Sequence, residues 1–235
     1  MIKTQIVIPC FNESEGLLNL IDECRTVIDS SDYSLGFILV DNGSKDGSNA
    51  IFSSLQGKYA NIEIVSLPEN QGYGGGIIAG LNSSTAQIIG WTHADLQTPL
   101  IDCLKATQAI DAEISFVKGI RVGRPFSDRV FSRGMGIFES ILFASRLEEV
   151  NAQPTLFNRN FYEEWQDPPA DFSLDLYALV VAVKSGLGIR RIRVHFLPRR
   201  FGQSNWNVGL KSRIKFIKRT LKYSYELRKT LHENL

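Results

Sequence analysis

Short apolar runs rich in β-branched residues alternate along the first half of the chain with stretches whose apolar residues recur at helical spacing. Strands are predicted over residues 4–9, 36–40 and 62–67, and from 88 in an apolar run that stops at Asp95. Helical periodicity follows over 13–30, 48–59 and 77–81, and a further helix is expected to begin near Pro99. This alternation indicates an α/β fold with a mostly parallel central sheet.

The second half of the chain is less regular. Its predicted elements are a strand over 114–119, a helix over 126–146, a loop over 151–160 that contains Pro154, a helix over 172–185 and a strand over 189–197. No internal repeat or low-complexity linker interrupts the pattern. We therefore expect one domain over residues 1–206, followed by a helical tail over 207–235.

The composition is that of an ordinary globular protein. The 235 residues are 43% hydrophobic and 22% charged, and no apolar run reaches the length of a membrane span. The three cysteines are odd in number and lack metal-ligand spacing, which predicts buried free thiols in a reducing compartment. The opening residues run straight into a strand without a secretory leader, so we expect a cytoplasmic location.

Charge is distributed unevenly along the chain. Residues 190–222 contain eleven Lys/Arg and no acidic residue, whereas the remainder carries 15 basic against 25 acidic side chains. Such a segment suits an anionic partner: a phosphate, a lipid surface or a nucleic acid. Because no nucleic-acid-binding motif or interleaved aromatic platform accompanies the charge, we expect no nucleic-acid partner.

The tail has the pattern of a basic amphipathic helix. Leu210, Ile214, Ile217 and Leu221 recur at helical spacing among six Lys/Arg residues. A helix of this kind can make peripheral contact with an anionic membrane face. It can equally pack on its own domain with a solvated charged face, and the sequence leaves both alternatives open.

Polar residues follow three of the predicted strands. Asp95 and Gln97 end one strand, Asp41 ends another, and residues 9–13 form a third polar turn. The carboxyl edge of an open α/β sheet is where ligands bind, and carboxylate and amide oxygens suit Mg2+ or Mn2+ with a diphosphate. Taken alone, Asp95 is explained equally well as the cap of the following helix. Three converging polar turns favour a nucleotide site over three unrelated turns.

Five segments resemble, in order and at matching spacing, the motifs of the family 2 glycosyltransferases. They are residues 7–13 (VIPCFNE), 40–48 (VDNGSKDGS), 70–76 (NQGYGGG), 94–99 (ADLQTP) and 196–204 (FLPRRFGQS). The last is similar to a segment of the polyprenyl-phosphate sugar synthase branch, and the resemblance spans roughly residues 4–206. It implies the GT-A fold, a Rossmann-like three-layer α/β/α arrangement, with a nucleotide-diphosphate sugar as donor and Mg2+ or Mn2+ as cofactor.

The resemblance also implies roles for individual residues. The donor nucleotide would be surrounded by Pro9, Phe11, Asn12, Glu13, Asp41, Gly72 and Ala94. The metal would be bound by Asp95 and Gln97, with His93 as a further ligand or a hydrogen-bonding turn residue. The chain departs from the family at Asn42 and His93, where aspartate is common. Weaker metal binding, or a non-catalytic protein that only binds a nucleotide sugar, therefore stays open.

The expected reaction is an inverting transfer to a polyprenyl phosphate at the inner membrane face. A phosphate acceptor is already ionised, so the site needs cations rather than a base. The candidates are Arg121, Arg129, Ser132, Arg133 and Ser204, with Arg200 as a catalytic residue. If the acceptor is instead a sugar hydroxyl, as in glycan assembly, a base is required, and Asp175 is the best placed. For Asp171 and Asp175 the simpler explanation is helix capping. Whether the chain forms a homo-oligomer is left open.

The glycine-rich segment has a second interpretation. Residues 74–79 fit the dinucleotide-binding pattern G-x-G-x-x-A. That pattern belongs directly after the first strand, whereas here it follows the third. We therefore predict that these glycines provide backbone flexibility near the sugar or the diphosphate.

Overall fold

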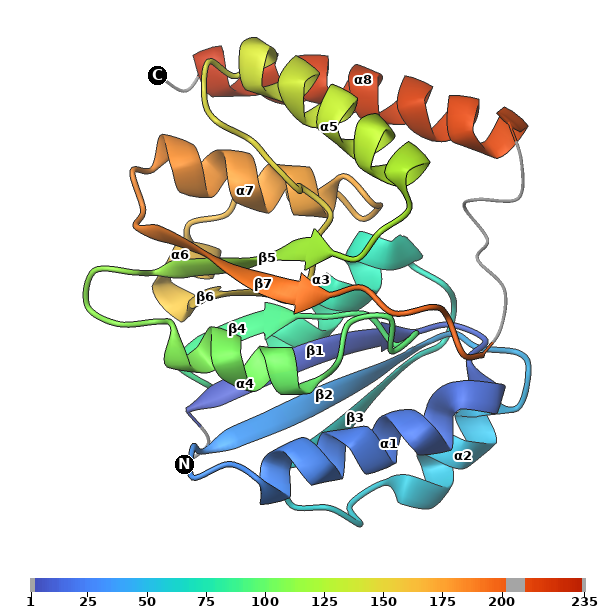
Figure 1. The fold of residues 1–235 in the computed structure, drawn as a ribbon. Coiled ribbons are helices and arrows are strands. Elements are labelled where there is room, and N and C mark those ends of the chain that lie inside the picture. Colours follow the sequence, from blue (N-terminus) through green and yellow to red (C-terminus); the bar gives the residue numbers. More distant parts are fainter. Residues whose placement is uncertain (1–2, 202–209, 234–235) are drawn as a thin grey trace.

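A computed structural model describes residues 3–201 and 210–233 as a layered α/β molecule built on a seven-stranded sheet (Figure 1). The strand order is β3-β2-β1-β4-β6-β5-β7. The strands are β1 Thr4–Cys10, β2 Leu35–Asn42, β3 Ile62–Leu67, β4 Ile88–Trp91, β5 Phe116–Val122, β6 Thr155–Asn158 and β7 Ile189–His195. The helices are α1 Ser14–Asp29, α2 Ser48–Leu55, α3 Gly72–Ser83, α4 Ile101–Gln108, α5 Phe126–Leu142, α6 Arg159–Glu163, α7 Leu174–Lys184 and α8 Leu210–Glu233.

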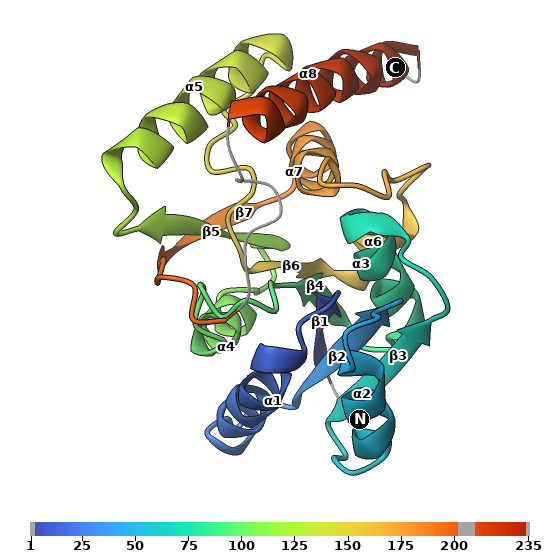
Figure 2. The ribbon, with the colours of Figure 1, turned by 90° about the vertical axis from the view of Figure 1, so that its right-hand side faces the viewer.

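The predicted three-layer arrangement with a mostly parallel sheet is confirmed. Strands β1 to β4 are mutually parallel, and β7 is parallel to β5. Helices lie on both faces of the sheet, and α5 and α8 form an additional pair outside α7 (Figure 1). The carboxyl ends of the parallel strands meet at the right-hand edge of Figure 1, which faces the viewer in Figure 2.

One strand was not predicted. The expected loop over 151–160 contains β6, which runs antiparallel between β4 and β5 and joins the two halves of the sheet. It has only four residues, and its partners lie far away in the sequence: Thr155 pairs with Trp91 on one side and with Lys118 on the other. A strand of this length carries too little periodicity to be distinguished from a loop.

Alternation along the central strands builds two separate cores. In β1, Ile6 and Ile8 face the core under α1, α2 and α4, whereas Val7 between them faces the core under α3, α5 and α7. Both cores are continuous from strand to strand because neighbouring strands keep the same register. The three cysteines are buried free thiols, as predicted.

The prediction of a flexible glycine segment is wrong, because α3 already begins at Gly72. Its glycines allow close packing. A side chain at Gly74 would collide with the backbone at Pro169, and one at Gly80 would collide with Val7 of β1. A glycine whose Cβ site is filled by a neighbouring backbone is retained for contact rather than for mobility.

The tail helix α8 packs on the domain. Tyr223, Leu227 and Leu231 join the core under α7, and the Tyr225 ring contacts Phe138 of α5. Arg219 pairs with Asp171 at 3.2 Å. Among the helices that the structure describes, none has the length and apolar composition required to cross a membrane.

Candidate functional site

The turns after β1 and β2 are joined by hydrogen bonds at the carboxyl edge of the sheet. Asn12 adopts a left-handed conformation (φ 56°), its N–H donates to Ser44 Oγ (3.1 Å), and its Oδ1 accepts from Lys45 N–H (2.8 Å). Asp41, at the end of β2, is buried and accepts from Ser44 N–H through Oδ1 (2.9 Å). The two predicted polar turns therefore form one unit.

A second aspartate holds the beginning of α1 against the beginning of α2. Asp46 accepts from Ser14 N–H (2.9 Å) and from the Ser48 hydroxyl (2.6 Å), and Ser48 Oγ accepts from Glu13 N–H (3.2 Å). Slight burial raises the pKa of Asp46, but the hydrogen bonds from Ser48 and Ser14 outweigh it and lower the value to about 2. The start of α1 is thus fixed by a charged acceptor.

The turn after β4 places Asp95 on the same edge. Asp95 Oδ1 accepts from Gln97 N–H (3.1 Å), so this carboxylate stabilises its own turn, in which Leu96 has a positive φ of 54°. Gln97 is tied to the segment after β7 twice: Leu197 N–H donates to its carbonyl (2.7 Å), and its Nε2 donates to Leu197 O (3.0 Å). One carboxylate oxygen of Asp95 and the Gln97 amide oxygen have no other bond in the described residues.

Arg199, which lies late in the sequence, packs against this edge and pairs with Glu13. Its Nη2 donates to Glu13 Oε1 at 2.7 Å, and both side chains are about one-fifth exposed, at 21% and 19%. Burial raises the pKa of Glu13, and the Arg199 guanidinium opposes that rise. The ion pair and the Gln97–Leu197 bonds attach the late motif to two polar turns.

Asn42 holds the turn between β3 and α3 in place. Its Oδ1 accepts from Gln71 N–H (3.0 Å), and its Nδ2 donates to Gly72 O (2.8 Å), so both ends of the amide hold the turn before α3. Tyr73 follows, with its ring stacked on Phe172 (4.5 Å between centroids) and 5.5 Å from the His93 ring. An aspartate at position 42 has no donor for Gly72 O, which gives the departure at Asn42 a structural reason.

A sealed polar network lies beneath the edge. Asp175, at the start of α7, accepts from Lys118 Nζ of β5 (3.0 Å), Gln153 Nε2 (2.8 Å) and the Tyr73 hydroxyl (3.2 Å). Lys118 is fully buried and also donates to Thr155 Oγ1 (2.7 Å). Burial lowers the pKa of Lys118 to about 8 although Asp175 opposes the shift, and burial, followed by the charge of Asp175, raises that of Tyr73. A paired carboxylate enclosed in this way is poorly placed to receive a proton from a substrate.

Arginines gather where β5 leads into α5. Arg121 and Arg124 share the Glu149 carboxylate, at 2.7 and 3.6 Å, and the ring of Phe196 lies 5.8 and 5.7 Å from the two guanidinium carbons. Arg124 also donates to Ser132 Oγ (2.9 Å). Burial, and then the positive charge of Arg121, lower the pKa of Arg124. Asp128 is a second acid near Arg124, so this corner, the arginine corner, holds two arginines and two acids.

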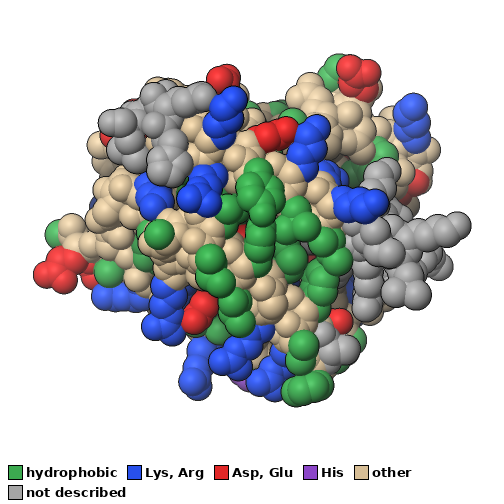
Figure 3. Space-filling view, turned by 90° about the horizontal axis from the view of Figure 1, so that it is seen from above, with side chains coloured by type: hydrophobic (Ala, Val, Ile, Leu, Met, Phe, Trp, Pro, Cys, Tyr) green, Lys and Arg blue, Asp and Glu red, His purple; other side chains and the backbone are tan. Residues whose placement is uncertain are grey.

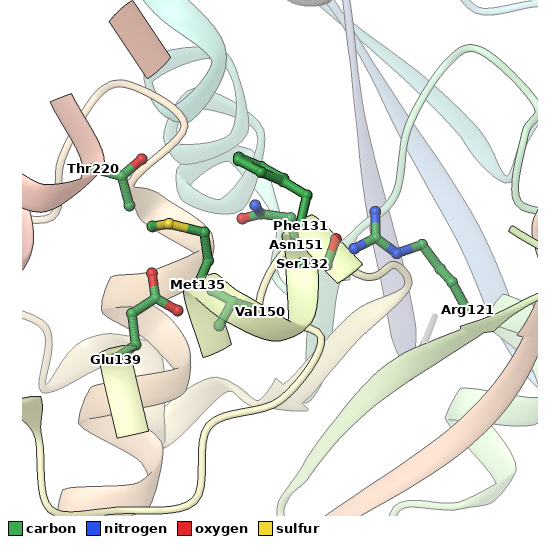
Figure 4. A pocket seen from close by; sticks show the side chains of 8 residues that line it. All are labelled: Arg121, Phe131, Ser132, Met135, Glu139, Val150, Asn151 and Thr220. Atoms are coloured by element: carbon green, nitrogen blue, oxygen red, sulfur yellow. The ribbon is translucent and has the colours of Figure 1, made fainter. Parts of the chain in front are cut away.

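A cavity of about 40 Å³ lies between this corner and α8. Figure 4 shows Arg121 and Ser132 at one side of it, with Met135, Glu139 and Thr220 at the other. Glu139 is buried, and burial raises the pKa of its carboxyl to about 7. The cavity is large enough for about two waters.

The structure brings all ten predicted nucleotide-binding and metal-binding residues to one edge of the sheet. Pro9, Phe11, Asn12, Glu13, Asp41, His93, Ala94, Asp95 and Gln97 lie on the three turns or at the strand ends beside them, and Gly72 is bonded to Asn42 at the end of β2. Of the predicted acceptor residues, Arg121 and Ser132 belong to the arginine corner, and Arg129 and Arg133 are exposed on α5. Arg200 is exposed next to Arg199, and Ser204 lies outside the described residues. These placements leave the chemical roles as predictions.

The oxygen ligands at this edge suit a metal ion that a substrate phosphate would also bind. Among the described residues, no group of three His, Cys, Asp or Glu could form an all-protein site. Mg2+ and similar ions, however, are usually held by one or two carboxylates together with substrate phosphates. Asp95 with the Gln97 amide is a set of hard oxygens of that kind.

Sequence reasoning missed Lys118, Gln153 and Arg199. A lysine between Val117 and Gly119 in an apolar strand was the only signal for the buried network. Arg199 stood beside Arg200 in the late motif, and sequence gave no means of deciding which arginine faces the site.

The sequence profile described as Glycosyl transferase family 2 matches residues 5–168. Two similar solved structures are of glucosyl-3-phosphoglycerate synthase from Mycobacterium tuberculosis. The complex with Mn2+, UDP-glucose and phosphoglyceric acid is 16% identical, with 94% of this chain and 79% of that chain covered and a TM-score of 0.68. The complex with Mn2+ and UDP-glucose is 18% identical, with coverage of 94% and 78% and a TM-score of 0.67. A mycobacterial protein is also 18% identical, with coverage of 90% and 71% and a TM-score of 0.67. At such identities the likeness establishes a shared fold.

Proposed function

We propose, because the chain belongs to family 2 of the glycosyltransferases, that it transfers a sugar from a uridine-diphosphate donor to a phosphate-bearing acceptor, with inversion at the anomeric carbon. The observation that carries the proposal is the convergence of three polar turns, with Asp41 and Asp95, at the carboxyl edge of the sheet.

The turns after β1 and β2 suit the nucleoside. Asp41 uses one carboxylate oxygen to hold Ser44, which leaves the other to accept from a base N–H. Phe11 is 36% exposed beside it and offers an apolar ring. Uridine is favoured over guanosine because the structural neighbours bind UDP and UDP-glucose.

Asp95 with Gln97, and His93 beside them, would hold Mg2+ or Mn2+ together with the donor diphosphate. Once bound, the ion would neutralise the charge that develops on the leaving diphosphate. The chain itself contributes the rigid turn: Gln97 is fixed to the segment after β7, so the carboxylate of Asp95 is held in place before a donor arrives.

A phosphate acceptor agrees better with the structure than a sugar hydroxyl. A hydroxyl requires a base, and Asp175 is enclosed by Lys118, Gln153 and Tyr73. A phosphate requires cations, and the candidates are Arg121 and Arg124, which pair with Glu149, together with the exposed Arg129 and Arg133. We favour a lipid phosphate at the inner face of the cytoplasmic membrane, with the basic side chains of α8 as a peripheral contact. The structural neighbour that binds phosphoglyceric acid also takes a phosphate-bearing molecule.

Calorimetric titration tests the donor site. UDP-glucose is expected to bind in the presence of Mn2+, more weakly with EDTA, and more tightly than GDP-mannose. Asp95→Asn removes the charged ligand and is expected to lower the Mn2+-dependent affinity by about 100-fold. Asp22→Asn, in an exposed ion pair on α1, is the matched control.

Two results would contradict the proposal. Unchanged Mn2+-dependent affinity in Asp95→Asn would remove the metal assignment. If no nucleotide sugar bound to the folded protein, with or without metal, the donor assignment itself would fail.

A further inference from the structure

Helix α5 presents large apolar side chains to solvent. Phe126 is 77% exposed, Val130 55%, Ile137 55% and Ile141 76%. Their spacings of four, seven and four residues place them on one side of the helix. We call these four residues the α5 stripe. They account for four of the ten large hydrophobic residues that are exposed among the described residues.

The stripe is additional to the face that anchors α5 to the domain. Leu142 is buried in the core under α7, and Phe138 packs against that core and against Tyr225 of α8. The fold therefore does not use the stripe for its own packing. A contiguous exposed apolar surface on a folded chain usually marks a place where something binds.

Arginines provide the exposed charge on α5 itself, and the exposed acids nearby lie on neighbouring segments, at Glu148 and Glu226. Arg129 and Arg133 are exposed along one border of the stripe, whereas the two acids of α5 are half-buried (Asp128) or buried (Glu139). The helix therefore exposes arginines without an exposed carboxylate.

The neighbouring helix α8 continues this surface. Lys218 and Lys222 are exposed there beside Tyr225, which is 57% exposed, and Glu226 is the nearby acid, 3.7 Å from Lys222. Figure 3 looks down on this side of the molecule and shows apolar side chains gathered in a patch, with several Lys and Arg and a few Asp or Glu side chains around it.

We propose that the α5 stripe lies in the headgroup layer of an anionic lipid bilayer. An apolar ridge bordered by arginines and lysines matches a surface that is apolar within and negatively charged outside. A second copy of this chain fits less well, because a two-fold contact through the stripe would bring the positive borders of both copies together.

The position of the stripe agrees with a lipid-borne acceptor. Strand β5 ends at Val122, and Gly123 to Pro125 lead directly into Phe126, so the stripe begins beside the carboxyl edge of the sheet (Figure 2). A bilayer on this side would lie next to the arginine corner. The inference rests on the membrane placement in the proposed function and names the surface that makes the contact, but its evidence is the surface of α5, whether or not the donor is a nucleotide sugar.

Vesicle flotation tests the inference with the full chain. The protein is expected to float with vesicles of phosphatidylcholine containing 30% phosphatidylglycerol, and much less with phosphatidylcholine alone. Ile137→Asp and Ile141→Asp are each expected to weaken partitioning roughly ten-fold. Arg129→Gln and Arg133→Gln are each expected to weaken it about five-fold on the anionic vesicles only.

Leu18→Asp on α1 is the matched control, because Leu18 is 58% exposed on a helix of the opposite sheet face. It is expected to float like the parent chain. Circular dichroism and UDP-glucose titration on every variant separate loss of fold, or failure of the donor proposal, from loss of vesicle binding.

Three outcomes would overturn the inference. One is a folded parent chain that does not float with anionic vesicles, and another is an equal loss in the Leu18→Asp control. The third is a parent dimer that Ile141→Asp converts to a monomer without changing flotation, since the stripe would then be covered by a second copy.

Discussion

The two halves of the sheet, β1–β4 and β5–β7, use polar groups in opposite ways. In the half that we propose to bind the donor, called the donor side, the turns after β1, β2 and β4 carry partly exposed groups such as Glu13, which pairs with Arg199, and Asp95, which bonds within its own turn. On the β5–β7 side, Lys118 and Asp175 are 0% and 2% exposed and use their bonds on each other and on buried amide and hydroxyl groups.

The polar groups at the turns can exchange their hydrogen-bond partners for a ligand or for water. The buried groups around Lys118 and Asp175, called the framework, cannot. A half-exposed carboxylate keeps a lone pair for a ligand, and water can replace any bond that it gives up. A buried ion pair has no such substitute, so losing one partner leaves a charge in a medium that stabilises it poorly. We therefore expect substitutions on the donor side to change binding, and substitutions in the framework to change stability.

The largest effect is expected for Lys118→Met. It leaves the Asp175 carboxylate buried and unpaired, which is expected to lower the free energy of unfolding by about 3–5 kcal/mol. Urea denaturation followed by circular dichroism measures the loss. If the variant lost less than about 1 kcal/mol, the network would not be the framework described above.

The double variant Lys118→Met/Asp175→Leu sharpens that test. Because a buried ion pair can often be replaced by apolar residues of similar volume, much of the lost stability is expected to return. The exposed pair Arg25–Asp22 is the control, and Arg25→Met is expected to cost less than about 0.5 kcal/mol.

Glu139 makes the framework side sensitive to pH. Its pKa is about 7 in the folded chain against 4.5 for an ordinary glutamate, so the unfolded chain loses this proton first as the pH rises. The folded chain then binds more protons than the unfolded one, and stability falls between about pH 4.5 and 7 by about 3 kcal/mol.

Glu139→Gln is expected to remove this fall, so that the variant is more stable than the parent at pH 8 and equal to it at pH 4. Denaturation across the pH range measures it, with the 56%-exposed Glu148→Gln as control. An unchanged pH profile would mean that the charged carboxylate is solvated in its cavity.

Most strands and polar turns of the donor side could be predicted from the sequence, because each is marked by residues next to one another in the chain. The central strands there are short apolar runs, and each polar turn follows its strand directly, so the sheet order alone brings Asp41 and Asp95 to the same edge. The glycine segment was misjudged because its constraint is a distant backbone at Pro169.

The contacts of the framework side could not be predicted from the sequence, because the residues that pair there lie far apart along the chain. Lys118 and Asp175 are 57 positions apart, and Arg199 is 186 positions from Glu13. Strand β6 has four residues and owes its place to Trp91 and Lys118. The tail was predicted to be a basic amphipathic helix, and the face by which α8 packs on the domain became visible only with the core that it covers.

The smallest change in stability is expected where the two sides meet, at the Glu13–Arg199 pair. Arg199→Gln is expected to cost less than about 1 kcal/mol, because both partners are partly solvated. The variant is expected to change the pH dependence of binding instead, because Arg199 lowers the pKa of Glu13 against the effect of burial. Without it, Glu13 takes up a proton at higher pH, and the acid limb of the plot of UDP-glucose affinity against pH is expected to move to higher pH.

Arg200→Gln, next in the chain, is the control and is expected to leave that limb in place. Equal shifts in both variants would mean that general charge, rather than this ion pair, sets the protonation of Glu13.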